Sequence, residues 1–183
     1  VDIVFDVTKN EAGNPVGYYY ASDTYIGGIA GSLTTGSVVT DSYSKGNIYG
    51  EGTNSVNIGG IAGSTRGDYH VYDDATNELI YTQHDMIIRC YSISDITSEP
   101  YSSGYLGGIV GLVRGSNIGE IPEIYENFAL NKVIDGNGKC IANRILGNSY
   151  AFEDSGYYNY ALDTMDIRNA DVQEDEANYK SSM

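Results

Sequence analysis

The sequence predicts an all-β protein built as a parallel β-helix, a solenoid of about four short coils with one inserted hairpin. Three observations lead to this prediction. A glycine-rich heptapeptide recurs along the chain, a short aromatic motif recurs between its copies, and the composition suits strands and turns. The 183 residues include 23 Gly and 18 Tyr but only 3 Pro and no Trp, which favours short strands joined by tight turns.

The heptapeptide occurs as Tyr25–Gly31, Asn57–Gly63 and Tyr105–Gly111, and a degraded fourth copy ends at Gly147. The fourth copy has Asn143 and Arg144 in place of two glycines, so we expect it to mark the end of the stack. Stacked coils bring backbones into contact, and glycine permits that approach. The repeated glycines are therefore expected to serve the architecture: Gly27, Gly28, Gly31, Gly59, Gly60, Gly63, Gly107, Gly108 and Gly111.

An aromatic residue flanked by small or amide residues occupies a second recurring slot. We expect this slot, and the apolar positions of the heptapeptide, to form columns of core side chains along the axis. The predicted columns are Ile26, Ile58 and Leu106; Ile29, Ile61, Ile109 and Ile145; and the aromatic Tyr43, Tyr91, Phe128 and Tyr160.

A β-propeller is the competing repeat architecture, but each of its blades needs four antiparallel strands and its repeats usually contain Trp. Each repeat here offers two good strands and one short one. That count fits one coil of a β-helix better.

The repeats divide the chain into three parts. Residues 1–24 are expected to be the end of a preceding coil or an N-terminal cap, and residues 25–165 to be the repeats. Residues 64–86 interrupt the second repeat as a hairpin with a polar tip. Residues 166–183, which are acidic and poor in apolar side chains, are expected to form a loosely ordered tail or linker.

The net charge of −15 excludes some partners. It would repel a nucleic-acid backbone and an anionic membrane surface. Solubility is the simplest explanation of the charge, and capture of Ca²⁺ by surface carboxylates is the functional alternative.

Two cysteines, Cys90 and Cys140, are too few for a disulfide framework, and they form either one bridge or two buried free thiols. No apolar run approaches the length of a membrane-spanning helix, so we expect no membrane insertion by this segment. The chain opens without a signal-peptide pattern. We interpret it as an excised or processed segment of a longer chain with flanking domains.

The repeats resemble the GLUG motif of bacterial cell-surface and secreted proteins, including IgA-specific metallopeptidases and filamentous-haemagglutinin-like adhesins. The resemblance rests on Gly27–Gly31, Gly59–Gly63 and Gly107–Gly111, with the companion segments Asp41–Ser44 and Glu126–Ala129. It covers about residues 25–165 and departs from the motif in the 64–86 insertion and the two replaced glycines. It implies a right-handed β-helical region of an exported bacterial protein, at the cell surface or outside the cell. The motif has no catalytic role to carry over.

Metal and cofactor chemistry find little support in the sequence. A metallopeptidase would need His-Glu-x-x-His, whereas His70 and His84, the only histidines, are 14 positions apart and neither is followed by Glu. We expect both to be solvated in the inserted hairpin, and a weak metal site with Asp73, Asp74 and Asp85 is the alternative. The calcium-binding Gly-Gly-x-Gly-x-Asp repeat is absent, because apolar residues follow the Gly-Gly pairs. No cofactor is predicted.

A carbohydrate-active enzyme is the main rival function, since parallel β-helices also serve as polysaccharide lyases and glycosidases. Such chemistry needs paired acids, or an acid near a basic residue, in one cleft. Asp41, Arg89 and Glu126 each lie two residues before the aromatic slot and are the candidates. A salt-linked surface ladder is the simpler interpretation and the one we favour.

The sequence thus predicts a non-catalytic structural or adhesive module of a bacterial cell-surface or secreted protein, which binds a host glycan or a host protein. A carbohydrate-active enzyme domain and a spacer without a ligand are the alternatives. Several tyrosines are expected near the surface: Tyr18, Tyr19, Tyr20, Tyr101, Tyr105, Tyr157 and Tyr158. They either supply the contacts, because exposed rings stack on sugars and anchor protein interfaces, or reflect the preference of tyrosine for strands. No catalytic residue is predicted.

Overall fold

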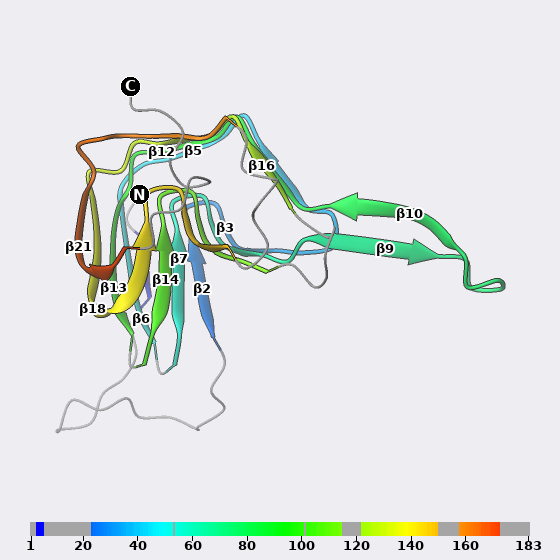
Figure 1. The fold of residues 1–183 in the computed structure, drawn as a ribbon, viewed down its shortest axis with the longest axis horizontal. Helices are drawn as coiled ribbons and strands as arrows, with labels where there is room; N and C mark the ends of the chain where they lie inside the picture. The colour runs from blue at the N-terminus through cyan, green and yellow to red at the C-terminus, as the bar shows by residue number, and fades with distance from the viewer. Residues whose placement is uncertain are drawn as a thin grey trace.

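The computed structural model describes residues 3–5, 23–52, 54–100, 102–114, 122–149 and 158–172. Within these ranges the protein is all-β, without a helix, and its strands form five parallel rows and one antiparallel hairpin. The rows lie side by side as a compact body, and the hairpin extends away from it (Figure 1).

Every row takes one strand from successive repeats, always in parallel register. The first two rows contain the glycine-rich heptapeptides: β2 (Thr24–Gly27), β7 (Val56–Gly59), β14 (Gly104–Gly107) and β18 (Val133–Asn143); then β3 (Ala30–Leu33), β8 (Ala62–Thr65), β15 (Val110–Val113) and β19 (Leu146–Ser149).

Two further rows are shorter and lead into and out of a sharp corner. They are β4 (Val38–Thr40), β11 (Met86–Ile88) and β16 (Glu123–Tyr125), and then β5 (Tyr43–Ser44), β12 (Tyr91–Ser92), β17 (Phe128–Ala129) and β20 (Tyr160–Ala161).

The fifth row closes each circuit and consists of β1 (Ile3–Phe5), β6 (Asn47–Gly52), β13 (Asp95–Pro100), β18 and β21 (Asp166–Asp171). The start of β18 pairs with β13 and its end pairs with β14, so the first and fifth rows join into one eight-stranded sheet. We call each circuit through the rows a tier, and tiers one to four begin at β2, β7, β14 and the end of β18.

The tiers enclose one apolar core, and strands of the fifth row alternate inward and outward side chains. In β13, Ile96 and Ser98 are buried while Asp95 and Thr97 are partly exposed. Ile96 lies in register between Ile48 and Ile134 of the neighbouring tiers. Each of these isoleucines contributes about 1.5–3 kcal/mol by burial. This column was not among those predicted from the sequence.

The predicted apolar columns of the heptapeptide are confirmed for the inner tiers. Ile58, Leu106, Ile61 and Ile109 are fully buried, and Ile26 is 6% exposed. Ile29 differs, with 43% of its surface exposed, because β3 is the last strand of its row and no described strand covers it. The prediction that Ile29 is a core residue is therefore wrong, because it lies at the end of the described stack.

The glycines of the heptapeptide are required by close approach between tiers. A Cβ on Gly111 would meet the backbone nitrogen of Ile58 at 2.6 Å and the carbonyl oxygen of Gly63 at 2.7 Å. None of the nine repeated glycines has a positive φ. Apart from Gly31, in the first tier, their role is to leave room for the backbone of a neighbouring tier rather than to adopt a left-handed turn.

The predictions for the C-terminal and N-terminal segments can each be compared with the structure in part. Strand β21 occupies Asp166–Asp171 and pairs with β18, so the loosely ordered tail does not begin at residue 166 as predicted. Ile167 of β21 lies in register with Ile134 of β18, and it is an apolar residue among charged neighbours. Residues 173–183 of the predicted tail lie outside the described residues. Of the predicted N-terminal cap, β1 pairs with β6, and residues 6–22 are likewise outside the description.

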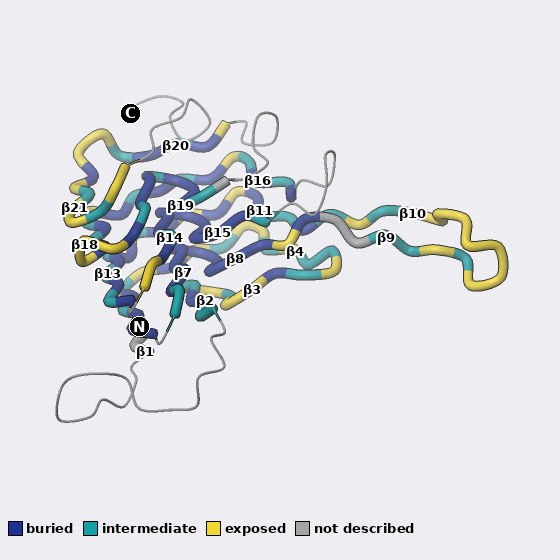
Figure 2. The backbone as a smooth tube through the Cα atoms, turned by 60° about the horizontal axis from the view of Figure 1, so that its bottom comes forward, coloured by how far each residue is buried: buried dark blue, intermediate teal, exposed yellow. Residues whose placement is uncertain are grey.

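The inserted hairpin is present as predicted. β9 (Asp68–Tyr72) and β10 (Leu79–His84) pair antiparallel, with one irregularity in register between Leu79 and Tyr81. Figure 2 shows the contrast with the body: most of the stacked strands are buried, whereas the outer part of the hairpin is exposed.

Candidate functional site at the outer corner

The corner between the third and fourth rows has the same backbone conformation in each tier. Its first residue is left-handed, with φ of 50° at Asp41, 51° at Arg89, 58° at Glu126 and 64° at Tyr158. None of these is glycine, and such a conformation is uncommon for other residues. Its recurrence at one slot shows that the corner turns the chain here in every tier.

In tiers three and four the next residue is an asparagine that points inward and supports the turn. The Asn127 side chain accepts a hydrogen bond from the Cys90 backbone N–H at 2.9 Å and donates to the Ile87 carbonyl at 2.8 Å. Asn159 repeats this one tier on, accepting from the Asn127 N–H at 3.1 Å and donating to the Ile124 carbonyl at 2.8 Å. Both side chains are buried, so each satisfies corner backbone groups that water cannot reach.

The aromatic residue that follows points outward, which corrects the prediction of a core column. The column itself exists: the rings of Tyr43 and Tyr91 stack with centroids 5.0 Å apart, and those of Phe128 and Tyr160 at 5.2 Å. However, Tyr43 is 59% exposed and Tyr91 is 37% exposed. The left-handed residue resets the strand alternation, which sequence spacing alone could not reveal.

The small residue after the ring points inward against the second glycine of the heptapeptide. A Cβ on Gly60 would meet Ser92, and a Cβ on Gly108 would meet the Ala129 methyl group at 2.7 Å. Ser44 lies in the same way against Gly28. The glycine pair and the small residue after the aromatic slot both recur in the sequence because they contact each other in the fold.

Asp41 and Arg89 lie on the outer surface and bind each other. Arg89 donates to the two carboxylate oxygens of Asp41, at 2.6 and 2.7 Å, and to the Thr40 hydroxyl at 3.0 Å. The hydrogen bonds from Arg89 lower the pKa of Asp41 to about 2, and the same contact raises the pKa of Arg89. Asp41 therefore stays ionised at neutral pH and is a poor general acid. The predicted salt link is present between these two residues.

The outward side chains of tiers two to four line a shallow groove of about 480 Å³. Tyr158, from the left-handed column, is 65% exposed at this groove. The groove brings the predicted residues Arg89 and Glu126 together with the aromatic column, whereas Asp41 is not among its lining residues. Its lining is Arg89, Tyr91, Glu126, Phe128, Tyr158 and Tyr160.

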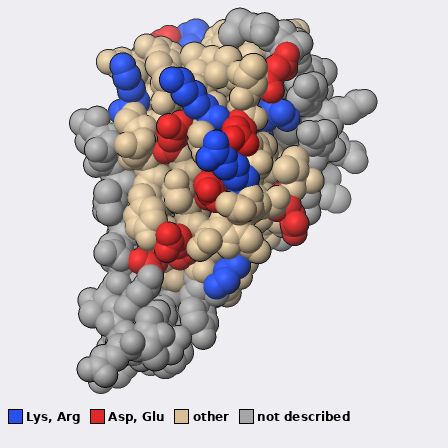
Figure 3. All heavy atoms as spheres, turned by 90° about the vertical axis from the view of Figure 1, so that its left-hand side faces the viewer, with Lys and Arg blue, Asp and Glu red and all other residues tan. Residues whose placement is uncertain are grey.

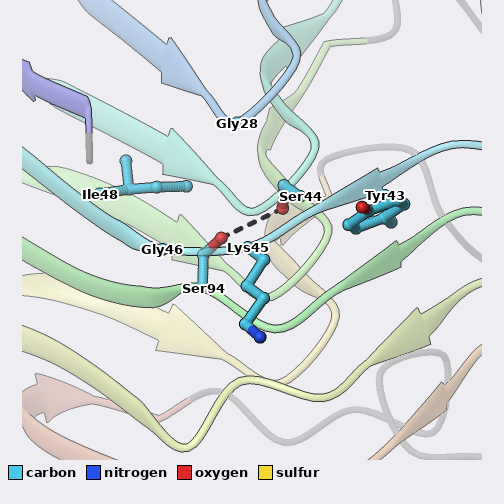
Figure 4. Close-up of a pocket in the computed structure, with 7 residues that line it drawn as sticks. All are labelled: Gly28, Tyr43, Ser44, Lys45, Gly46, Ile48 and Ser94. Carbon is cyan, nitrogen blue, oxygen red and sulfur yellow. Dashed lines mark hydrogen bonds between the residues drawn. The ribbon is translucent and has the colours of Figure 1, made fainter. Parts of the chain in front are cut away.

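A second hollow, of about 570 Å³, lies beside the first tier (Figure 4). It is lined by Gly28, Tyr43 and Lys45 among others, and the hydroxyl groups of Ser44 and Ser94 face each other there at 3.2 Å. β2, β3 and β5 are each the last strand of their row. Since no described strand lies beyond these three, the hollow opens at the end of the stack within the described part of the chain.

The histidine and acidic residues of the hairpin do not gather into a metal site. His70 Nδ1 is 2.8 Å from the Thr82 hydroxyl, across the two strands. Asp85 is fully buried and accepts hydrogen bonds from the backbone N–H groups of Ser37 and Arg66, at 2.9 and 3.1 Å. Across the described ranges, no three His, Cys, Asp or Glu side chains are grouped to hold a metal ion.

The two cysteines are buried free thiols, which decides between the two alternatives left open by the sequence. Burial raises the pKa of both thiols, that of Cys140 to about 11. Both therefore remain protonated at neutral pH and have little nucleophilic character.

Charge is mixed on the face formed by β6, β13, β18 and β21. Acidic and basic side chains alternate over this face (Figure 3), and Arg168 binds Asp166 on it at 2.5 Å. The acidic surplus of the chain is not concentrated there. Within the described part of the chain, no helix is long and apolar enough to cross a membrane.

Comparison of the chain with known protein families, with curated proteins and with solved structures found no match.

Proposed function

We propose that this chain is a non-catalytic structural and adhesive module of a bacterial cell-surface or secreted protein, built as a segment of right-handed parallel β-helix. We further propose that the groove at the outer corner is its binding surface, and that the ligand is an uncharged glycan.

The register of the strands supports the β-helical part of the proposal. Tyr25, Asn57, Tyr105 and Ile141 align across the first row, although insertions make the repeats unequal in length. Such alignment is what a solenoid requires, because each coil contacts only its neighbours. The resemblance to the GLUG motif supports the exported bacterial context.

One observation supports binding above the others: the outward side chains of three successive tiers line one groove. It combines aromatic rings with an arginine and a carboxylate, the mixture that recognises the apolar faces and hydroxyl groups of sugars. Exposed Tyr158 offers a ring for stacking, whereas Tyr91 already stacks on Tyr43.

The charges of this surface favour a neutral ligand. Asp41 binds Arg89, and Glu126 adds a further carboxylate on the same column. With a chain charge of −15, an acidic polysaccharide would be repelled.

A glycan-array screen of the purified chain tests the proposal. We expect binding to neutral oligosaccharides, with a loss of about fivefold or more in affinity for Tyr158→Ala, since stacking on a ring is worth on the order of 1 kcal/mol. Tyr72→Ala, at an exposed hairpin position, is the matched control and should bind normally. Binding only to acidic glycans, or equal loss in both variants, would contradict the proposed site.

The rival function is a carbohydrate-active enzyme, favoured by Glu126 and Arg89 lining the same groove. A polysaccharide degradation assay run beside the array separates the two. Release of reducing ends or unsaturated sugars, abolished by Glu126→Gln, would replace the adhesive proposal with the enzymatic one.

A further inference from the structure

The hairpin of β9 and β10, here called the arm (residues 68–84), extends from the body. Hydrogen bonds order both its outer turn and its base. At its outer turn the Asp73 carboxylate accepts hydrogen bonds from the N–H groups of Ala75 and Thr76, both at 2.8 Å. At its base Asp85 fixes the backbone of Arg66 and of Ser37, in a different tier. The arm therefore projects as a formed element rather than as a loop (Figure 1).

Large apolar side chains are exposed along the arm. Tyr72 is 48% exposed, Leu79 53%, Ile80 58% and Tyr81 48%. A solvated hairpin needs none of these, and clustered exposed apolar side chains mark interaction surfaces.

These side chains lie on both faces of the arm. Tyr72 pairs with Leu79, and the neighbouring pair, Val71 with Tyr81, points to the opposite side because strands alternate. His70 lies on the Tyr72 side, with ring centroids 6.2 Å apart. An arm that is apolar on both faces is suited to lie within a larger sheet rather than on a surface.

The arm also lacks the neighbours that a sheet requires. It has two strands, and neither is paired on its outer edge with another described strand. A two-stranded ribbon is marginally stable in water, and three or more strands are needed for independent stability.

The outer edge of β10 is suited to pairing with itself. Leu79–Gln83 has no charged residue and no proline and is rich in β-forming side chains, which is the composition of a segment that pairs with a copy of itself. Natural edges are protected by charges, prolines, short strands or bulges, and of these the segment has only the register irregularity between Leu79 and Tyr81.

The charges beyond this segment select one orientation. Asp73, Asp74 and Glu78 lie at the outer turn, whereas the base has exposed Arg66 together with Asp68 and buried Asp85. In an antiparallel pair the acidic turn of each arm lies beside the base of the other, whereas a parallel pair would place the two acidic turns together.

We propose that two copies of this chain associate through their arms, with β10 pairing antiparallel to β10 of the second copy to form a four-stranded sheet. The association is isologous, so it closes at the dimer. It does not depend on the glycan groove, and it would give the dimer two such grooves.

Sedimentation velocity on the 183-residue chain tests the proposal. We expect a species of twice the 19.8 kDa monomer mass, populated increasingly with concentration. The double variant Ile80→Lys with Tyr81→Lys should be monomeric, because charged edges do not pair. Val38→Lys is the matched control: Val38 is 55% exposed on β4, the last strand of another row, and this variant should still dimerise. A monomeric wild type, or a double variant that still dimerises, would overturn the proposal.

Cysteine crosslinking tests the relative orientation of the two arms. Both native thiols are buried, so an introduced surface cysteine is the one that can crosslink. Tyr81 is the central residue of Leu79–Gln83, so Tyr81→Cys places two thiols near the two-fold axis and should form a covalent dimer on mild oxidation. Asp74→Cys, at the outer turn, should not. Crosslinking of the Asp74→Cys variant alone would reject the antiparallel arrangement.

Discussion

The body and the arm use the same residue types with opposite results. Ile61 in the body is fully buried, while Ile80 in the arm is 58% exposed. All four residues of β8 are buried between β3 and β15, whereas β10 has one partner strand and is largely exposed. Burial in this protein is thus decided by the number of neighbouring strands rather than by composition.

The first tier lies between these extremes and shows the same rule within the body. Ile29 and Tyr43 are more exposed than Ile61 and Tyr91, which occupy the same slots one tier on. A substitution in an inner tier can therefore be compared with the same substitution at the equivalent position of the first tier, which serves as its control.

Gly111→Ala is expected to have the largest effect on the body. Its Cβ would meet the backbone of Ile58 and of Gly63, neither of which can move alone, so we expect a loss of about 3 kcal/mol in the free energy of unfolding. In the same slot of the first tier, a Cβ on Gly31 would meet, among the described residues, only the Tyr25 carbonyl group, with the oxygen at 3.1 Å. Gly31→Ala should therefore cost about 1 kcal/mol or less. Denaturant unfolding of both variants measures the difference, and equal losses would refute the close-approach explanation.

Asn127→Ala is expected to come next. The substitution leaves the Cys90 N–H and the Ile87 carbonyl unsatisfied inside the body, which should cost about 2–3 kcal/mol. In the first tier the same slot holds Ser42, whose hydroxyl bonds only the nearby Thr40 carbonyl at 2.8 Å. Ser42→Ala should change stability by about 0.5 kcal/mol or less, and a comparable loss in both variants would show that the buried amide is not what supports the corner.

Replacing residues 69–83 with a short Gly-Ser linker should have a smaller effect. No arm residue whose burial is described belongs to the buried core, so we expect the free energy of unfolding to change by less than about 1 kcal/mol at concentrations where the chain is monomeric. Thermal and denaturant unfolding give the measurement. A cooperative loss of the whole fold would mean that body and arm are one unit.

Asp41→Asn should have the smallest effect, confined to a pH window. The pKa of Asp41 is lowered from 3.8 to about 2, so its ion pair with Arg89 stabilises the folded state above pH 4 and this contribution is lost as pH falls toward 2. The stabilities of wild type and variant should differ slightly at neutral pH, since both side chains are exposed, and converge near pH 2. If the difference in stability between wild type and variant instead grew as pH falls, the lowered pKa of Asp41 would not come from its ion pair with Arg89.

The sequence predicted much of the scaffold, because its repeats are themselves the contacts. The heptapeptide glycines, the inserted hairpin and the aromatic column follow from spacing and composition, and the structure contains all three. The orientation of the column could not be predicted, because it depends on left-handed conformations at residues such as Asp41 and Arg89 that carry no glycine signal.

The groove was also missed, since it is formed by residues from three tiers that are far apart in the sequence. Tyr158 occupies the same slot as Asp41, Arg89 and Glu126, and aligning the corners of all four repeats would have placed it there. Asp85 was considered only as a metal ligand. Its role at the base of the arm involves backbone N–H groups, which leave no trace in a residue pattern.

The left-handed corner has a consequence for how such a surface can change over evolution. Its four residues point away from the core, and the turn is supported from inside, most clearly by Asn127 and Asn159, so the side chain at each corner is not required for packing. Asp, Arg, Glu and Tyr already occupy the four positions. One edge of the body is therefore a row of exposed sites about 4.8 Å apart, two of which pair as Asp41 and Arg89, and residues can be exchanged there while the fold stays the same.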